Sequence, residues 1–315
     1  MTDQQNEQIS FCKKWLIAAR PWALPASTMP VIFGTSLAIV IGKARFDVFH
    51  FILAFVGMVI LHSAANMMSD VFDFKRGLDK MTTPVSGAIV RGWITTKQAA
   101  AGAVILFALG SVIGIILVLE VGTILLIIGA VGVAIGVFYA ALKYHAFGDL
   151  AVFLNFGILG SLGAWVVQTR TFSWIPVLWT IPMAMLVSAI LHANNWRDTA
   201  TDKEKKVITM AGLLGDKGSL GYYASLIFKP FIIIGIFIFG PRVISIQFPA
   251  MPLTFLITIL ALFNAFKLWG RAKRRHEPRE PMDFIILDGA TAQHNLIFGL
   301  LCTAAVWIHF AITLL

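Results

Sequence analysis

The sequence predicts an all-α protein that crosses a membrane several times. Of its 315 residues, 58% are hydrophobic and only 13% are charged, about half the charged fraction that is usual in soluble domains. The hydrophobic residues form runs of about 20, the length of helix that spans a bilayer core of ~30 Å. Because these runs are continuous rather than alternating, they indicate helices and not the strands of a membrane barrel.

Nine segments have the composition of transmembrane helices. In chain order they are residues 22–42, 49–68, 98–118, 122–142, 150–169, 174–194, 222–240, 250–269 and 290–314. Residues 1–20 are polar and basic, so we interpret them as a cytoplasmic tail and not as a cleavable leader. Short connections such as Glu120-Val121 favour antiparallel neighbours, and glycines inside the segments favour close helix packing. Residues 21–315 are therefore predicted to form a single membrane domain.

The distribution of basic residues predicts the orientation. With the N-terminus in the cytoplasm, the tail and the cytoplasmic connections contain 19 of the 25 Lys and Arg residues, as the positive-inside rule requires. The same rule accounts for the net charge of +9 without a nucleic-acid partner. The basic run between the last two segments is interpreted as topogenic and lipid-facing: Arg271, Lys273, Arg274, Arg275 and Arg279. We expect a multi-pass protein of the cell (inner) membrane.

Two similar clusters of amide and carboxylate side chains follow two of the hydrophobic segments. The first contains Asn66, Asp70 and Asp73, and the second contains Asn194, Asp198 and Asp202. Residues three or four apart share one face of a helix, so each cluster is predicted to point in one direction. Acidic residues at the margin of a membrane indicate a functional site, and the predicted orientation places both clusters on the cytoplasmic side.

The composition of the clusters favours a Mg²⁺-diphosphate site. Several carboxylates facing one cavity would repel one another without a cation, and oxygen-only ligands suit Mg²⁺. We predict that the metal and the catalytic site involve Asn66, Asp70, Asp73, Asp198 and Asp202. Cationic and polar neighbours could bind the substrate: Lys80, Arg91, Arg197, Lys203, Tyr139 and Asn194. The chain has no glycine-rich phosphate loop, which argues against a nucleoside triphosphate.

A diphosphate bound at the mouth of an apolar helical bundle implies a ligand with an apolar tail, such as a polyprenyl diphosphate. Loss of diphosphate would leave an allylic carbocation, which aromatic faces can shield. Besides Tyr139, the candidates for this role are Tyr144 and Trp196. His62 and His192, which precede the two clusters, are interpreted as hydrogen-bonding groups between helices.

These motifs resemble the UbiA superfamily of intramembrane prenyltransferases. The first motif of that family matches Asn66, Asp70 and Asp73, and the second matches Asp198 and Asp202. The resemblance covers nearly the whole chain. It implies a nine-helix bundle and a Mg²⁺-dependent transfer of a polyprenyl group, with release of diphosphate, to an aromatic quinone precursor.

Three further stretches are similar to the menaquinone branch of this superfamily. They are residues 20–25 (RPWALP), residues 91–95 (RGWIT) and residues 194–198 (NNWRD). This similarity implies 1,4-dihydroxy-2-naphthoate as the acceptor and demethylmenaquinone as the product. Other acceptors such as 4-hydroxybenzoate stay open, as do two other classes of protein, an ion-coupled transporter and a non-catalytic isoprenoid-lipid carrier.

Overall fold

The computed structural model describes residues 10–78, 87–244, 248–277 and 283–315, and their regular structure is almost entirely helical. In chain order the helices are α1 (Phe11–Ala19), η1 (Pro21–Ala23), α2 (Pro25–Val40), α3 (Val48–Lys75), α4 (Thr96–Val121), α5 (Thr123–Lys143), α6 (Gly148–Val152), η2 (Phe153–Leu159), α7 (Gly160–Thr169), α8 (Trp174–Trp179), α9 (Ile181–Arg197), α10 (Thr199–Glu204), α11 (Met210–Ile244), η3 (Leu253–Ala261), α12 (Leu262–Ala272) and α13 (Leu287–Leu314). The predicted all-α class is confirmed.

The described residues include six helices that are long and apolar enough to cross a membrane, or seven if the bent pair Phe11–Ala23 and Pro25–Val40 is one span. Nine were predicted. The two other predicted segments correspond to α5, whose apolar part is short, and to the pair α8 and α9. The latter segment is interrupted at Thr180, because Pro182 stands in the first turn of α9 and lacks an N–H that could continue α8.

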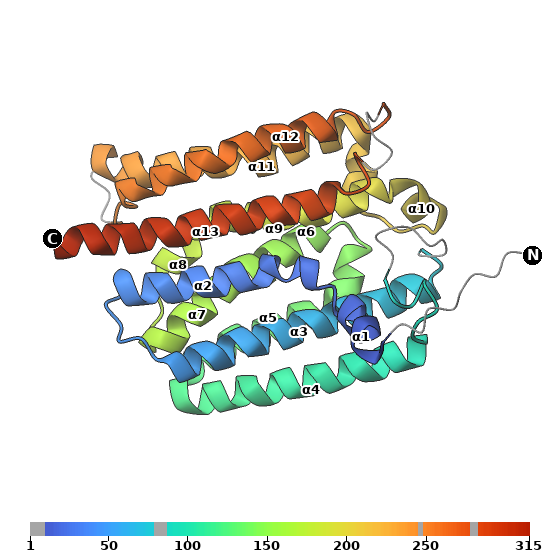
Figure 1. Cartoon of the computed structure of the whole chain (residues 1–315), viewed down its shortest axis with the longest axis horizontal. Helices are drawn as coiled ribbons and strands as arrows, with labels where there is room; N and C mark the ends of the chain where they lie inside the picture. The colour runs from blue at the N-terminus through green and yellow to red at the C-terminus, as the bar shows by residue number, and fades with distance from the viewer. Residues whose placement is uncertain (1–9, 79–86, 245–247, 278–282) are drawn as a thin grey trace, which may run out of the picture.

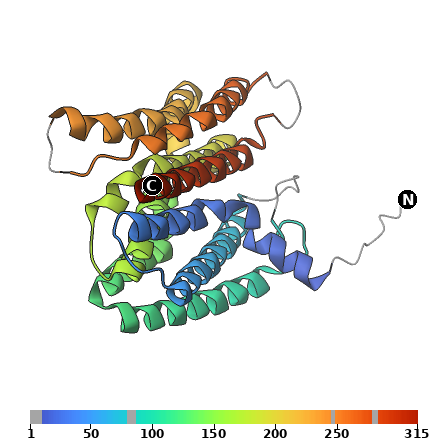
Figure 2. The ribbon, with the colours of Figure 1, turned by 60° about the vertical axis from the view of Figure 1, so that its left-hand side comes forward.

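The helices lie side by side in one bundle. In Figure 1, α13 runs between the pair α11 and α12 on one side and α2 on the other, and it contacts α2, α9 and α12. Figure 2 shows α3 and α4 on the opposite side of the bundle from α11 and α12. The end of α3, the helix α10 and the start of α13 lie at one end of the molecule, and the C-terminus lies at the other (Figure 1). Both motifs are therefore at the same end.

Close contacts between small residues hold the centre of the bundle together. Gly34 in α2 faces the backbone of Ser161 in α7, where an added Cβ would lie 2.2 Å from the Ser161 carbonyl oxygen. Gly157 packs in the same way on Ala184 of α9. Gly157 belongs to η2, a π-helical stretch between α6 and α7. Such stretches occur frequently at functional sites, and η2 forms part of the cavity described below.

The described part of the predicted N-terminal tail, which begins at residue 10, contains one regular element. Residues 11–19 form α1, and the side chain of Trp15 in this helix packs on Gly102 of α4. Arg20 has the left-handed conformation at the end of α1, and the chain bends by 59° further on, between Ala23 and Pro25. The Arg20 side chain lies beside the first motif, where it pairs with Asp70.

Candidate active site

A cavity of about 1000 Å³ opens at the end of the bundle that contains both motifs. Its walls come from α3, α5, α6, η2, α9, α10 and the start of α13. The charged residues lie near the helix ends, whereas the part inside the bundle is lined by apolar side chains such as Val152, Phe156, Val187 and Ile190. The cavity therefore combines a polar mouth with an apolar interior.

The first motif lies on the last turns of α3. Asn66 and Asp73 line the cavity, and the Asn66 amide donates a hydrogen bond to the Ala19 carbonyl at 3.1 Å. Asp70 is buried beside the cavity and forms an ion pair with Arg20. Gly87 is needed next to it, since an added Cβ would lie 2.6 Å from an Asp70 carboxylate oxygen. Asp70 thus anchors the turn before α2 rather than forming the cavity wall.

Asp73 is fixed by two residues at the end of α5. Lys143 Nζ lies 3.0 Å from one carboxylate oxygen, and the Tyr144 hydroxyl donates to the other at 2.9 Å. Burial and the neighbouring charge of Asp73 raise the pKa of the Tyr144 phenol, so it stays a donor at neutral pH. The guanidinium of Arg76 covers the Tyr144 ring at 4.0 Å. Tyr144 therefore orients Asp73 and does not line the cavity. Tyr139, which lies one helical turn before Lys143 in α5, does line it.

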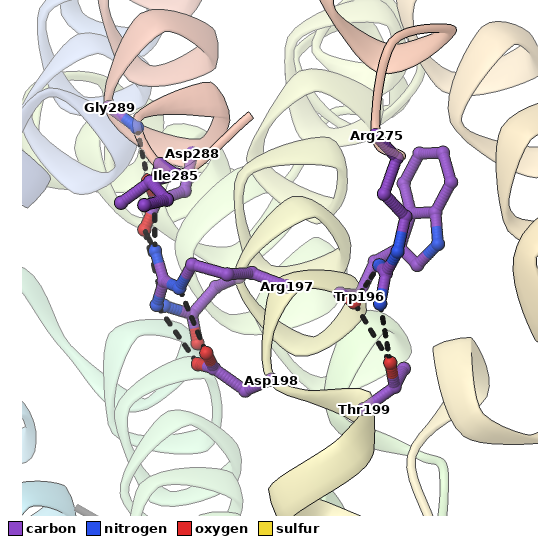
Figure 3. A network of polar contacts seen from close by, with 9 residues as sticks. Trp196, Arg197, Asp198, Thr199, Arg275, Ile285, Asp288 and Gly289 are labelled. Carbon is purple, nitrogen blue, oxygen red and sulfur yellow. Dashed lines mark hydrogen bonds and ion pairs between the residues drawn. The ribbon is translucent and has the colours of Figure 1, made fainter. Parts of the chain in front are cut away.

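The second motif spans the junction of α9 and α10. Although the helix is interrupted after Arg197, the side chains of Asn194, Asp198 and Asp202 all line the cavity. Arg197 forms a bidentate pair with Asp198, with both N–O distances at 2.9 Å. On its other side Arg197 contacts Asp288 of α13 at 2.8 Å, as Figure 3 shows. Asp288 also accepts a hydrogen bond from Asn194 at 3.2 Å.

Three members of the basic run depart from the lipid-facing role that the sequence suggested. Arg271 and Arg274 pair with Asp283 at 3.8 and 2.9 Å, and Arg275 contacts the end of α9. Arg275 donates to the Trp196 carbonyl oxygen and, at 2.8 Å, to the Thr199 hydroxyl (Figure 3). It also pairs with Asp216 at 3.1 Å, and Asp216 accepts from the Trp196 indole at 2.8 Å. Arg275 thus caps the end of α9, and Trp196 is buried outside the cavity wall instead of shielding a carbocation.

The structure brings most of the predicted site residues together. Those that line the cavity are Asn66, Asp73, Arg91, Tyr139, Asn194, Arg197, Asp198 and Asp202. Asp70 is buried behind the wall. Lys203 is exposed and does not line the cavity, and Lys80 is outside the described residues.

Five charged residues that line the cavity were not assigned to the site from the sequence: Arg20, Lys143, Glu204, Lys205 and Asp288. Lys143 could have been found, because it follows Tyr139 by four residues and so shares its helix face. Lys203 lies within α10 and Lys205 follows the last residue of that helix, Glu204. The sequence does not show where α10 ends, so it could not distinguish which of the two lysines lines the cavity. Arg20 opens the stretch 20–25 that the sequence analysis singled out, but its contact with Asp70 and the contacts of Asp288 depend on tertiary packing, which the sequence does not show.

The donor set fits a magnesium ion that is completed by a ligand. Among the described residues there is no group of three or more acidic, histidine or cysteine side chains that could enclose a metal alone. The cavity wall instead offers oxygen donors on two sides, Asn66 and Asp73 on α3 and Asp198 and Asp202 near α10. Mg²⁺ commonly binds a few carboxylates together with substrate phosphates, so this arrangement suits the metal with a diphosphate present.

Comparisons with known proteins show the family to which the chain belongs. A model of the UbiA prenyltransferase family matches residues 27–287. The chain is 30% identical to the UbiA prenyltransferase domain-containing protein 1 homolog of Drosophila melanogaster, over 93% of this chain and 79% of that protein. It is also 30% identical to the 1,4-dihydroxy-2-naphthoate octaprenyltransferase of Bacillus subtilis (strain 168), over 92% and 91% of the two chains.

Solved structures share the fold. A UbiA homolog from Aeropyrum pernix K1 superposes with a TM-score of 0.62 at 17% identity, over 90% of this chain and 97% of that one. A UbiA homolog from Archaeoglobus fulgidus, bound to GPP and Mg²⁺, gives a TM-score of 0.61 at 14% identity, over 92% and 99%. From its sequence match, this chain belongs to the UbiA prenyltransferase family and is an enzyme that transfers prenyl groups.

Proposed function

We propose that the enzyme transfers a polyprenyl group from polyprenyl diphosphate to 1,4-dihydroxy-2-naphthoate, with demethylmenaquinone as the product. The observation that carries this proposal is a single cavity with both acidic motifs at its polar mouth and an apolar interior. Such a cavity suits a diphosphate with a long apolar tail. The acceptor is suggested by the name of the B. subtilis relative.

Mg²⁺ is the proposed cofactor, held by Asn66, Asp73, Asp198 and Asp202 together with diphosphate oxygens. Asp70 belongs to the same motif, and in this structure it supports the site through Arg20. When bound, the metal would stabilise the negative charge that develops on the departing diphosphate. The A. fulgidus homolog, which was solved with GPP and Mg²⁺, supports this cofactor.

Basic side chains of the cavity would then bind the free diphosphate oxygens. Lys143 and Arg197 already face the cavity while paired with Asp73 and Asp198. A diphosphate can replace these carboxylates as the partner of each cation, which frees the carboxylates for the metal. Arg91 and Lys205 line the same mouth and add positive charge.

Tyr139 is placed to protect the prenyl group after the bond to diphosphate breaks. Its ring lines the cavity one helical turn before Lys143. An aromatic face stabilises a nearby cation and excludes water. We therefore assign Tyr139 to shielding the allylic cation until the acceptor attacks.

The membrane arrangement is part of the proposal. We place the N-terminus and the mouth of the cavity in the cytoplasm, with nine membrane-embedded segments in the cell (inner) membrane. The bias of 19 of 25 basic residues toward the connections on that side supports this orientation.

Purified protein in detergent would test the function. It would be supplied with farnesyl or geranylgeranyl diphosphate and, in parallel, with 1,4-dihydroxy-2-naphthoate or 4-hydroxybenzoate, with Mg²⁺ or with EDTA. We expect prenylated naphthoate product by mass spectrometry only when Mg²⁺ is present. Product from 4-hydroxybenzoate alone would keep prenyl transfer and reject the naphthoate acceptor. Equal product in EDTA would reject the metal.

A further inference from the structure

The inner part of the cavity contains two polar side chains that neither acidic motif accounts for. His62 of α3 and Asn155 of η2 both line the cavity among apolar residues. His62 precedes Asn66 by one helical turn, so it lies about 6 Å deeper along α3 than the motif. A reacting ring must approach the prenyl carbon bonded to the diphosphate, and this depth suits that position.

The hydrogen bonds of His62 determine what its ring can bind. The Ser27 hydroxyl lies 2.7 Å from His62 Nδ1 and 3.1 Å from the Leu24 carbonyl oxygen, to which it can donate its proton. We assign the Ser27 proton to the Leu24 carbonyl oxygen, and with this assignment Ser27 accepts a hydrogen bond from Nδ1–H. In the neutral ring this leaves the lone pair on Nε2, which has no hydrogen-bond partner among the described residues. His62 thus offers an acceptor to the cavity.

Asn155 lies in the π-helical stretch η2, directly before Phe156. The His62 ring stacks on the neighbouring residue Phe156 with centroids 4.3 Å apart and an interplanar angle of 30°. Asn155 Oδ1 lies over Gly132 of α5, where an added Cβ would come within 3.1 Å. No hydrogen bond of the Asn155 amide occurs within the described ranges, so its amide group is available to a ligand.

We propose, on the basis of the proposed function, that His62 and Asn155 form the binding site for the hydroxylated aromatic acceptor. His62 Nε2 accepts the hydrogen bond of a ring hydroxyl, and the Asn155 amide donates to a second oxygen substituent. A prenyl chain in this place would strip water from both groups and offer no partner, which is unfavourable. The polar pair therefore selects the ring over the tail.

Equilibrium binding to purified protein tests this site independently of turnover. The probes are 1,4-dihydroxy-2-naphthoate and its two mono-O-methyl ethers, measured by calorimetry under anaerobic conditions. For His62→Leu we expect the Kd of the dihydroxy compound to rise about tenfold, with a partial recovery in His62→Gln. The Kd of farnesyl diphosphate should change less than twofold. The methyl ether that lacks the hydroxyl bound by His62 should bind the wild-type protein weakly. In His62→Leu, this ether and the dihydroxy compound should have similar Kd values.

Two further variants make the result decisive. Asn155→Leu should raise the Kd of the dihydroxy compound. His309→Leu alters a histidine outside the cavity and should leave that Kd unchanged. An unchanged Kd for the acceptor in His62→Leu, or a rise confined to farnesyl diphosphate, would overturn the proposal. Binding that depends on His62 in a protein without turnover would reject the proposed reaction while retaining this site.

Discussion

At the residue scale, the central feature of the site is that its acids are paired with bases. Asp73 is paired with Lys143, and Asp198 with Arg197. Near a low-dielectric interior an unpaired carboxylate is costly, so these pairs allow the acids to be kept in place before a ligand arrives. The pairs also hold the cations where diphosphate oxygens would bind.

Replacing Asp198 tests the role of the second motif. Its side chain is 41% exposed, so Asp198→Ala should fold normally while Mg²⁺-dependent turnover falls about 100-fold or more. Turnover can be followed by product mass, and folding by thermal unfolding in detergent. The matched control is Glu277→Ala, which removes an exposed acidic side chain that does not line the cavity. Near-normal turnover in Asp198→Ala would remove this residue from the site.

The two lysines after Asp202 should behave differently. Lys205 lines the cavity and Lys203 is exposed outside it. Lys205→Ala should raise the KM for prenyl diphosphate about tenfold, because a charge-assisted contact is lost, whereas Lys203→Ala should change it less than twofold. Steady-state kinetics at saturating acceptor measure both. The reverse order would mean that α10 is oriented differently when substrate is bound.

At the element scale, close helix contacts explain how the cavity walls keep their positions. Gly34→Ala would bring a methyl group against the Ser161 carbonyl of α7 and should destabilise the protein by about 1–3 kcal/mol. Gly114→Ala is the matched control, since an added Cβ there meets nothing within 4 Å. It should be neutral or slightly stabilising because alanine favours helices. Equal unfolding temperatures for the two variants would contradict this contact.

Sequence reasoning predicted the helices better than their contacts. Hydrophobic runs identified the helical segments, and the spacing of Asn66, Asp70 and Asp73 correctly placed them on one stretch of helix. That spacing could not show that Asp70 turns to Arg20 while Asp73 faces the cavity. The difference depends on the bend between α1 and α2, which local sequence does not specify.

The sequence was equally limited in predicting helix packing and interruptions within helices. Glycines are frequent in the predicted spans, yet Gly157 packs against a neighbouring helix and Gly114 faces open space. Their identity is the same, and only the tertiary arrangement distinguishes them. The interruption at Thr180 was missed because the apolar run continues across it, although Pro182 was a visible signal.

At the scale of the whole molecule, the two cysteines provide a test of orientation. Cys12 is exposed on α1, at the end of the bundle that contains the cavity mouth, and Cys302 is buried in α13. A membrane-impermeant maleimide should therefore label Cys12 in inverted vesicles and leave it unlabelled in intact cells. Cys12→Ser should abolish the labelling and serves as the control. Labelling from outside the cell would reverse the proposed topology.

The internal charge balance of the cavity has a consequence for the order in which ligands arrive. A free divalent ion would have to displace Lys143 from Asp73 and Arg197 from Asp198, which would remove the ion-pair partner of Lys143 and leave Arg197 with Asp288 alone. A preformed metal–diphosphate complex brings its own anionic oxygens, so all partners are exchanged at once and no charge is left unmatched. We therefore expect the metal and the prenyl donor to enter as one species, with the aromatic acceptor free to bind before or after them.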